Sequence, residues 1–171
     1  MKRFLIVAAA AGLFSTTALA ATALKVDTSK NCSFTVQLFS SLAPKHVAQI
    51  TKLASAGFYN GIVFHRVISG FMAQTGDPTG TGGGGSKEAN LTAEFTPTHF
   101  KRGTVGMART NDPNSANSQF FVMFGEIPGN QLDGKYTVFG EVNEDGMKCV
   151  DQIAKGEPPA TPDQMTKVTV Q

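Results

Sequence analysis

The segment FHRVISGFMAQTGDP, residues 64–78, places a permanent cation, Arg66, on what its apolar pattern predicts to be a strand. The large apolar residues Phe71 and Met72 follow, and then the amide of Gln74. In isolation, this arrangement is typical of a strand whose arginine faces solvent while the apolar side chains lie in the core. The rest of the chain decides whether Arg66 has a further role.

Short strand-like runs dominate the chain around this segment. Runs that alternate apolar and polar residues indicate half-buried strands, and continuously apolar runs indicate strands buried on both faces. The alternating runs are residues 34–39, 136–142 and 167–171, and the continuously apolar runs are 61–68, 71–76, 103–108 and 118–124.

Two segments have helical periodicity instead. The first has Pro44 in its opening turn, Val47 and Ile50 on one face, and Gly57 as a terminator. The second extends from about Asp145 to Lys155. Many strands with only two helices favour a mainly β domain with a closed or sandwiched antiparallel sheet.

The N-terminal segment, residues 1–20, has a basic start, an apolar middle and the small-x-small ending Ala-Leu-Ala, as in a signal peptide. Its apolar stretch is shorter than the about 20 residues that a membrane-spanning helix needs. We expect cleavage near Ala20/Ala21 and export of residues 21–171 as one domain.

The mature chain carries no excess charge. Without residues 1–20, which include Lys2 and Arg3, 13 basic and 13 acidic residues remain. Binding to nucleic acid or to an anionic membrane depends on clustered cations. We therefore expect neither as a partner, and a monomer by default.

Cys32 and Cys149 are the only two cysteines. In an oxidising compartment they can form a disulfide. Cys149 also fits a small buried apolar residue of a helix, with Cys32 as an unrelated thiol. No spacing rule brings the two together, so the sequence leaves both possibilities open.

The usual catalytic and cofactor motifs are absent. The three glycines that match G-x-G-x-x-G have no helix pattern after them, the three histidines are scattered without metal-ligand spacing, and no serine lies in a G-x-S-x-G setting. We therefore expect no nucleotide, no metal and no nucleophilic triad. The long loop at 76–100 is expected to be functional or mobile.

One enzymatic task needs none of these groups. Rotation of an X-Pro amide breaks no covalent bond, yet it faces a barrier of about 18–20 kcal/mol. An enzyme can lower this barrier with an apolar pocket for the proline ring and a donor aimed at the prolyl nitrogen, which gains a lone pair as the bond twists. An arginine suits this role because it is always charged and only donates.

Residues 64–78 resemble the signature of the cyclophilins, F-H-R-x-x-x-G-F-M-x-Q-x-G-D. The segments GMARTNDPNSANSQFFV at 106–122 and LDGKYTVFGEV at 132–142 resemble two more of that family's motifs, in the same order and with similar spacing. The resemblance spans about residues 24–171. It implies a closed eight-stranded antiparallel barrel capped by two α-helices, a side-chain-filled interior, a site on the outer surface, and X-Pro isomerisation without a cofactor.

The resemblance also implies roles for individual residues. Arg66 matches the catalytic arginine, Gln74 the amide that orients it and touches the substrate, and Phe71 a further catalytic position in the proline pocket. The other matched residues are implied to bind substrate: Met72 and Phe121 in the proline pocket, Leu132 at its rim, Tyr136 in its wall, Ala108 and the backbone of Arg109 along the substrate main chain, and Gln119 as a polar contact.

The chain departs from the best-known cytosolic members at two positions. Gln131 replaces a tryptophan that is the chief hydrogen-bonding partner of cyclosporin, so we expect no tight inhibition by that compound. Tyr136 replaces a histidine but keeps a flat, partly polar wall. The segment at 55–63 is short, as in bacterial members, and with the export signal this predicts a periplasmic protein.

The predicted function is isomerisation of X-Pro bonds in exported polypeptides as they fold. The alternative is a holdase that captures proline-containing segments and whose catalysis is incidental. The presence of both Arg66 and Gln74 favours the enzyme, because a binder does not need a cation directed at the nitrogen. The loop at 76–100 is expected to set the preference for the residue before proline.

Overall fold

The computed structural model describes residues 22–171, so the predicted signal peptide, residues 1–20, lies outside the described part. Eight strands and two α-helices follow one another in this part of the chain. In order they are β1 (Ala23–Thr28), β2 (Ser33–Leu38), α1 (Pro44–Ser55), β3 (Arg66–Ile68), β4 (Met72–Thr75), β5 (Thr104–Met107), β6 (Phe120–Met123), β7 (Val138–Val142), α2 (Glu144–Val150) and β8 (Met165–Val170).

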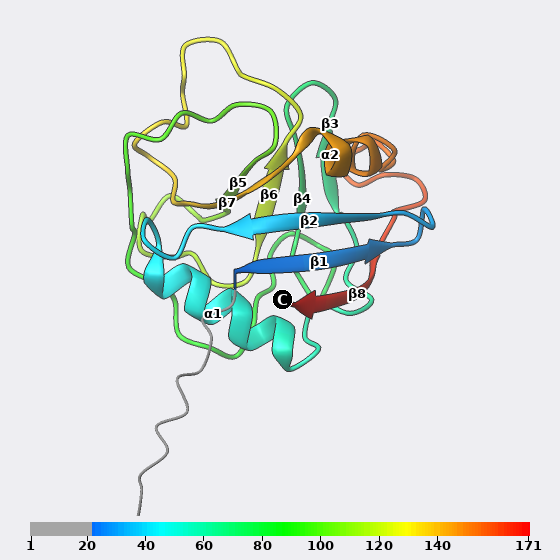
Figure 1. Ribbon diagram of the computed structural model, residues 1–171, viewed down its shortest axis with the longest axis horizontal. Helices are drawn as coiled ribbons and strands as arrows, with labels where there is room; N and C mark the ends of the chain where they lie inside the picture. Colours follow the sequence, from blue (N-terminus) through cyan, green and yellow to red (C-terminus); the bar gives the residue numbers. More distant parts are fainter. Residues whose placement is uncertain (1–21) are drawn as a thin grey trace, which may run out of the picture.

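The strands form one antiparallel sheet in the order β3-β4-β6-β5-β7-β2-β1-β8. The sheet is an open, curled half-barrel, and Figure 1 shows β2 crossing in front of β4 and β6. α1 packs beside β8 and α2 against β2. Between residues 22 and 171 there is no helix long and apolar enough to span a membrane.

The two ends of the sheet approach each other without a strand ladder among the described residues. The segment before β3 instead meets the start of β8. The Gly61 N–H donates to the Met165 carbonyl at 2.7 Å, and the Phe64 N–H donates to the Asp163 carbonyl at 2.8 Å. The mainly β fold with two helices is therefore confirmed, while complete closure of the barrel stays a prediction.

The local sequence patterns explain most of the elements. β2 buries every second residue, as its alternation predicts, and the continuously apolar β5 and β6 are buried throughout. α1 begins at Pro44, as expected, and buries the face that carries Val47 and Ile50. It ends before Gly57, whose positive φ of 72° suits a residue without a Cβ.

One strand was missed and two elements are shorter than predicted. β1 was not predicted, and only residues 66–68 of the expected strand at 61–68 are in β3. The second helix ends at Val150, not near Lys155. Beyond Val150 the chain tightens into turns, in which the Gln152 and Ile153 N–H groups donate to carbonyls three residues back, and the Ala154 N–H donates to the Asp163 carboxylate at 2.9 Å.

Side chains fill the interior of the curled sheet. Its core contains completely buried aromatic rings, in which Tyr59 meets Phe120 edge-to-face at 5.6 Å and Phe120 meets Phe139 at 5.9 Å. Along β6, Phe120 and Val122 belong to this core, whereas Phe121 and Met123 belong to a second apolar cluster on the opposite face. Because the interior is full, a substrate has to bind outside it.

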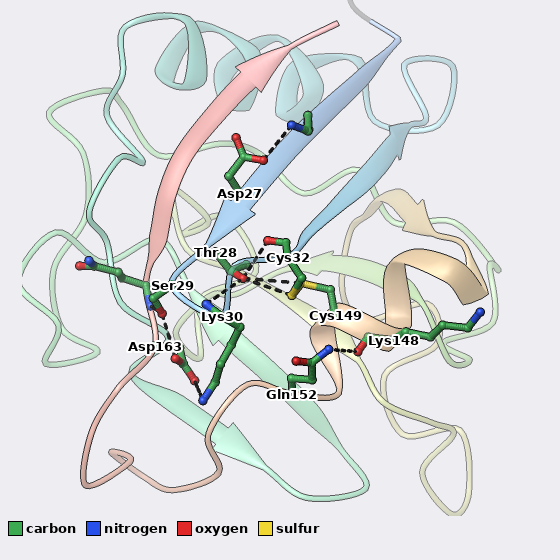
Figure 2. Close-up of a disulfide and its surroundings, with 11 residues drawn as sticks. Asp27, Thr28, Ser29, Lys30, Cys32, Lys148, Cys149, Gln152 and Asp163 are labelled. Carbon is green, nitrogen blue, oxygen red and sulfur yellow. Dashed lines mark hydrogen bonds and ion pairs between the residues drawn. A yellow bond between two sulfur atoms is a disulfide. The ribbon is translucent and has the colours of Figure 1, made fainter.

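A disulfide joins Cys32, in the turn between β1 and β2, to Cys149 of α2, with the two Cα atoms 5.7 Å apart. This resolves the alternative that the sequence left open. Figure 2 shows the Thr28 hydroxyl beside the bond, 3.5 Å from the Cys32 sulfur. The bridge spans 117 residues of sequence, and closing such a loop in the unfolded chain corresponds to roughly 4–5 kcal/mol in the chain-entropy description.

Candidate active site

Strand register places four residues in one row across the outer face of the sheet. Gln74 of β4 lies opposite Arg66 of β3 and Phe121 of β6, and Phe121 lies opposite Gly106 of β5. The adjacent row, which begins with Val67, belongs to the interior core, so this row points outward. Residues directly opposite each other on antiparallel strands are close enough for their side chains to interact.

An apolar pocket lies along this row. Its volume is about 130 Å³, and nine of the ten site residues predicted from the sequence line it: Arg66, Phe71, Met72, Gln74, Ala108, Arg109, Phe121, Leu132 and Tyr136. Met72, Phe121 and Leu132 are 1 %, 5 % and 9 % exposed, so the apolar part is well packed before any ligand enters. A pocket of this lining suits a small apolar ring.

The floor of the pocket depends on a glycine that the sequence analysis did not single out. A Cβ at Gly106 would lie 2.6 Å from the ring of Phe100 and 2.7 Å from the ring of Phe121. These two rings stack with their centroids 5.8 Å apart, and Phe121 meets Tyr136 edge-to-face at 6.0 Å. Gly106 thus provides the space in which the aromatic floor packs.

A polar pair next to Leu132 holds the rim of the pocket. The Asp133 carboxylate accepts the backbone N–H of Phe100 at 2.9 Å and contacts Nδ1 of His99 at 2.7 Å. This hydrogen bond to Asp133 raises the pKa of His99, and the contact with His99 lowers the pKa of Asp133. The pair therefore ties the segment before β5 to the loop that carries Leu132.

Arg66 has a neighbour that the sequence analysis missed. Its Nε donates to Oε2 of Glu157 at 2.8 Å. Glu157 lies in the loop after α2, far from Arg66 in sequence, and no sequence motif indicates that it lies near the site. Only the arrangement of the strands brings this carboxylate to the site.

Gln74 has a different partner from the one predicted. It lies opposite Arg66, but its Nε2 donates to Oε1 of Gln119 at 2.8 Å. Within residues 22–171, no hydrogen bond joins Gln74 to Arg66, and Glu157 makes the contact that was expected of the amide. The predicted orienting role of Gln74 therefore has no direct contact to support it.

A second, polar pocket of about 400 Å³ adjoins the first and shares Gln74, Ala108 and Arg109 with it. Gln119 lies here, outside the apolar pocket, and its Nε2 donates to the carbonyls of Gly82 and Gly84 at 2.9 and 2.8 Å. The remaining lining residues are Gly82, Gly83, Gly84, Gly85, Ser86, Asn90, Thr110, Ser115 and Asn117.

One carboxylate organises the glycine-rich wall of the second pocket. Asp77 is completely buried and accepts the backbone N–H groups of Thr79, Thr81, Gly82 and Gly84 at 2.6–3.1 Å. Burial alone would raise the pKa of Asp77, but these donors and the Thr79 hydroxyl lower it to about 2. As the sequence analysis predicted, no helix follows these glycines.

Arg109, which lines both pockets, braces the aromatic wall of the apolar one. Its guanidinium lies 4.4 Å from the centre of the Tyr136 ring, and its Nη2 donates to the Lys135 carbonyl at 2.9 Å. From the sequence, a role was predicted only for the backbone of this residue. The side chain braces the aromatic wall, as the planar guanidinium is suited to do.

Comparison with known proteins agrees with this geometry. The family described as "Cyclophilin type peptidyl-prolyl cis-trans isomerase/CLD" matches residues 23–170. The chain belongs to the cyclophilins. It is a peptidyl-prolyl cis-trans isomerase, and cyclophilin-type isomerases need no cofactor.

Bacterial and eukaryotic relatives resemble this cyclophilin. The chain is 49% identical over 158 residues to a probable peptidyl-prolyl cis-trans isomerase of Brucella suis, with 83% of this chain and 79% of that protein covered. It is 44% identical over 139 residues to the peptidyl-prolyl cis-trans isomerase-like 1 of Aspergillus oryzae, with 78% and 82% covered.

Solved cyclophilin structures share the fold. The cyclophilin AquaCyp293 from Hirschia baltica superposes with a TM-score of 0.77 at 30% identity, covering 88% of this chain and 74% of that one. A Cryptosporidium parvum cyclophilin, crystallised in the presence of the dipeptide Ala-Pro, superposes with a TM-score of 0.77 at 28% identity, covering 87% and 98%. Within residues 22–171 of this cyclophilin, no group of three or more His, Cys, Asp or Glu side chains could hold a metal ion.

Proposed function

We propose that this cyclophilin isomerises X-Pro bonds of exported polypeptides in the periplasm, with Arg66 as the donor to the prolyl nitrogen. The observation that carries the proposal is the outward row in which Arg66 and Gln74 lie beside Phe121. This row places a permanent cation at the edge of an apolar pocket. The Cryptosporidium parvum structure studied with Ala-Pro supports a proline-containing substrate.

The proline ring enters the apolar pocket against Met72, Phe121 and Leu132, with Phe71 and Tyr136 beside it. As the C–N bond twists, the nitrogen becomes pyramidal and gains a lone pair. The Nη groups of Arg66 donate to this lone pair, because Nε is engaged by Glu157. The contact is stronger in the twisted state than in the planar one, which is the condition for catalysis.

The substrate main chain pairs with the edge after β5. The Ala108 N–H donates to the Gln119 carbonyl at 3.0 Å, so the backbone polar groups of the next residue, Arg109, face away from β6 and pair with the substrate. Gln74 and Gln119 contact the substrate beyond the proline ring, at the entrance to the second pocket. Residues before the proline occupy that pocket, so the glycine-rich loop influences which of them are accepted.

Export is supported by two independent features. Residues 1–20 have the pattern of a cleavable signal peptide. The bond between Cys32 and Cys149 is of a kind that persists in oxidising compartments such as the periplasm. Uncatalysed X-Pro exchange takes tens to hundreds of seconds, so an isomerase there removes a slow step from the folding of exported chains.

We also infer that the sheet behaves as a closed barrel. The hydrogen bonds between residues 61–64 and 163–165 join its two ends. Hydrogen exchange of the backbone amides tests this inference. If the Phe64 and Met165 amide protons exchange as slowly as those of β6, closure is supported; if both exchange fast, closure is contradicted.

The test of the mechanism compares the mature protein with Arg66→Ala and Arg66→Lys, using NMR exchange on a short Xaa-Pro peptide. Loss of one transition-state donor costs on the order of 10²–10³-fold in kcat. We expect a loss of this size for Arg66→Ala, partial activity for Arg66→Lys, and unchanged stability, because the ion pair is exposed. If all three proteins bind the peptide but none accelerates exchange, the holdase alternative stands.

The proposed location has its own test. The full-length chain is produced in a bacterium and its periplasmic fraction is sequenced from the N-terminus. A periplasmic product that begins near Ala21 and contains the Cys32–Cys149 disulfide supports export. A cytoplasmic product that retains residues 1–20 would contradict it.

A further inference from the structure

Glu157 reaches Arg66 through a short antiparallel pairing on the free side of β3. Val67 and Gly156 exchange two backbone hydrogen bonds, each 2.8 Å long. In this register the next pair is Arg66 and Glu157, so both side chains leave the sheet on the same face. Arg66 therefore lies between Glu157 on one side and Gln74 on the other.

The backbone beside Glu157 is tightly constrained. Gly156 has a φ of 149°, and a Cβ there would lie 2.5 Å from the Cα of Pro159. Two consecutive prolines, Pro158 and Pro159, restrict the chain further. The carboxylate is therefore presented from a position with little backbone freedom, although its side chain is 52 % exposed.

Both ends of this loop are anchored to the body of the fold. On one side, the Lys155 ammonium donates to the Ile153 carbonyl at 2.8 Å and lies 4.2 Å from the centre of the Phe124 ring. On the other side, Asp163 accepts the Ser29 hydroxyl at 2.8 Å and contacts the Lys30 ammonium at 3.3 Å, as Figure 2 shows. These contacts hold the loop in place without involving the pocket.

We propose that Glu157 is a positioning residue for isomerisation: it holds the guanidinium of Arg66 by Nε, so that the Nη groups face the prolyl nitrogen. This inference rests on the role of Arg66 given under Proposed function. A guanidinium is a rigid planar fork, so one charge-assisted hydrogen bond at Nε restricts the direction of its other donors. Glu157 lies outside the apolar pocket and acts only through Arg66.

A positioning role explains the contact between Arg66 and Glu157 better than a purely stabilising role does. The side chains of Arg66 and Glu157 are 41 % and 52 % exposed, and exposed ion pairs contribute little to stability. The contact does, however, order a long side chain before substrate arrives. Without it, the ordering of Arg66 has to occur during each turnover, at a cost that corresponds to roughly 3- to 10-fold in rate.

The test uses Glu157→Ala and Glu157→Gln in the mature protein, with kcat and KM for a short Xaa-Pro peptide measured separately by NMR exchange. Glu157→Ala is expected to lower kcat roughly 3- to 10-fold while KM stays within about twofold, because the pocket for the ring is unchanged. Glu157→Gln keeps an acceptor oxygen and is expected to restore most of the rate. The ¹⁵Nε signal of Arg66 should shift in Glu157→Ala and move back toward the native position in Glu157→Gln.

A matched control is the exposed ion pair between Lys101 and Glu141, whose atoms are 3.1 Å apart and which lies away from the pocket. Glu141→Ala should change neither kcat nor the Arg66 signal. A native kcat and an unchanged Arg66 signal in Glu157→Ala would overturn the inference. The inference would also be overturned if both variants, Glu157→Ala and Glu157→Gln, lost kcat and thermal stability to the same extent, since that result indicates a structural role.

Double variants separate this inference from the proposal on which it rests. If Glu157 acts through Arg66, Glu157→Ala causes no further loss in an Arg66→Ala background. A further loss there would show that Glu157 acts independently of Arg66. If Arg66→Ala alone keeps the native rate, the proposed mechanism fails; if it loses the rate while Glu157→Ala does not, only the role of Glu157 fails.

Discussion

The two pockets of this site are built in opposite ways. The apolar pocket lies on paired strands, and many buried side chains share the task of shaping it, including Met72 and Phe121. The polar pocket has a wall without helix or strand, which folds around the single carboxylate of Asp77. In a surface shaped by distributed packing, no single side chain holds the whole structure, whereas a loop organised by one residue depends on that residue.

The largest expected effect is therefore at Asp77. The Asp77 carboxylate only accepts hydrogen bonds, and four backbone N–H groups donate to it. Asp77→Asn replaces one of its oxygens with an NH₂ group, which is itself a donor and leaves some of these N–H groups without an acceptor. We expect a loss of about 3 kcal/mol in unfolding free energy. Turnover of the dipeptide Ala-Pro flanked by neutral caps should change less than turnover of a longer peptide. Equal losses for both substrates would contradict the separation of the two pockets.

The pH dependence of stability tests the same residue. The pKa of Asp77 falls from 3.8 to about 2 on folding, which corresponds to roughly 2 kcal/mol. Because the folded pKa is depressed, this stability is present above about pH 4 and is lost as the pH falls through about 2. The measurement is the unfolding free energy of the native protein and of Asp77→Asn at several pH values. The difference between the two free energies should shrink as the pH falls from about 4 to about 2, and a constant difference would contradict the linkage.

A smaller effect is expected from overpacking the apolar pocket. Gly106→Ala places a methyl group against the rings of Phe100 and Phe121, and overpacking of this kind costs about 1–3 kcal/mol. Displacement of Phe121 toward the pocket should also raise KM. Thermal unfolding and peptide kinetics check both effects.

Gly83→Ala is the matched control for this change. The nearest atom that a Cβ at Gly83 would meet is the Thr81 hydroxyl at 3.7 Å, an ordinary contact, so stability should stay near native. If Gly83→Ala destabilises the protein as much as Gly106→Ala, the cost does not come from the aromatic floor.

The smallest effect is expected at Arg109, which lines both pockets. Arg109→Ala removes an exposed cation–π contact with Tyr136, worth about 0.5–1 kcal/mol, and the hydrogen bond to the Lys135 carbonyl. KM should rise by a few-fold for longer peptides, because these contact both pockets. Arg109→Lys keeps the charge without the planar fork, so a native KM in that variant would show that charge alone suffices.

The sequence was sufficient where short-range patterns determine structure. Alternation predicted β2 and β8, and the proline and glycine signals predicted α1. The three motifs at 64–78, 106–122 and 132–142 together indicated nine residues that line one pocket. These predictions depend on neighbours along the chain or on a recognisable linear motif. Element ends were less predictable, because groups distant in sequence contribute there: just beyond α2, the Ala154 N–H donates to the Asp163 carboxylate.

What tertiary structure alone decided is how segments far apart in sequence meet. The pairing of Cys32 with Cys149, the contact of Glu157 with Arg66, and the space that Gly106 leaves for two rings all depend on sheet topology and register. Composition and periodicity report which face of a strand is buried, but not which distant residue lies opposite. The sequence by itself therefore predicted the residues that line one apolar pocket and the cation at its edge, and the curled sheet determined which distant groups lie beside that cation.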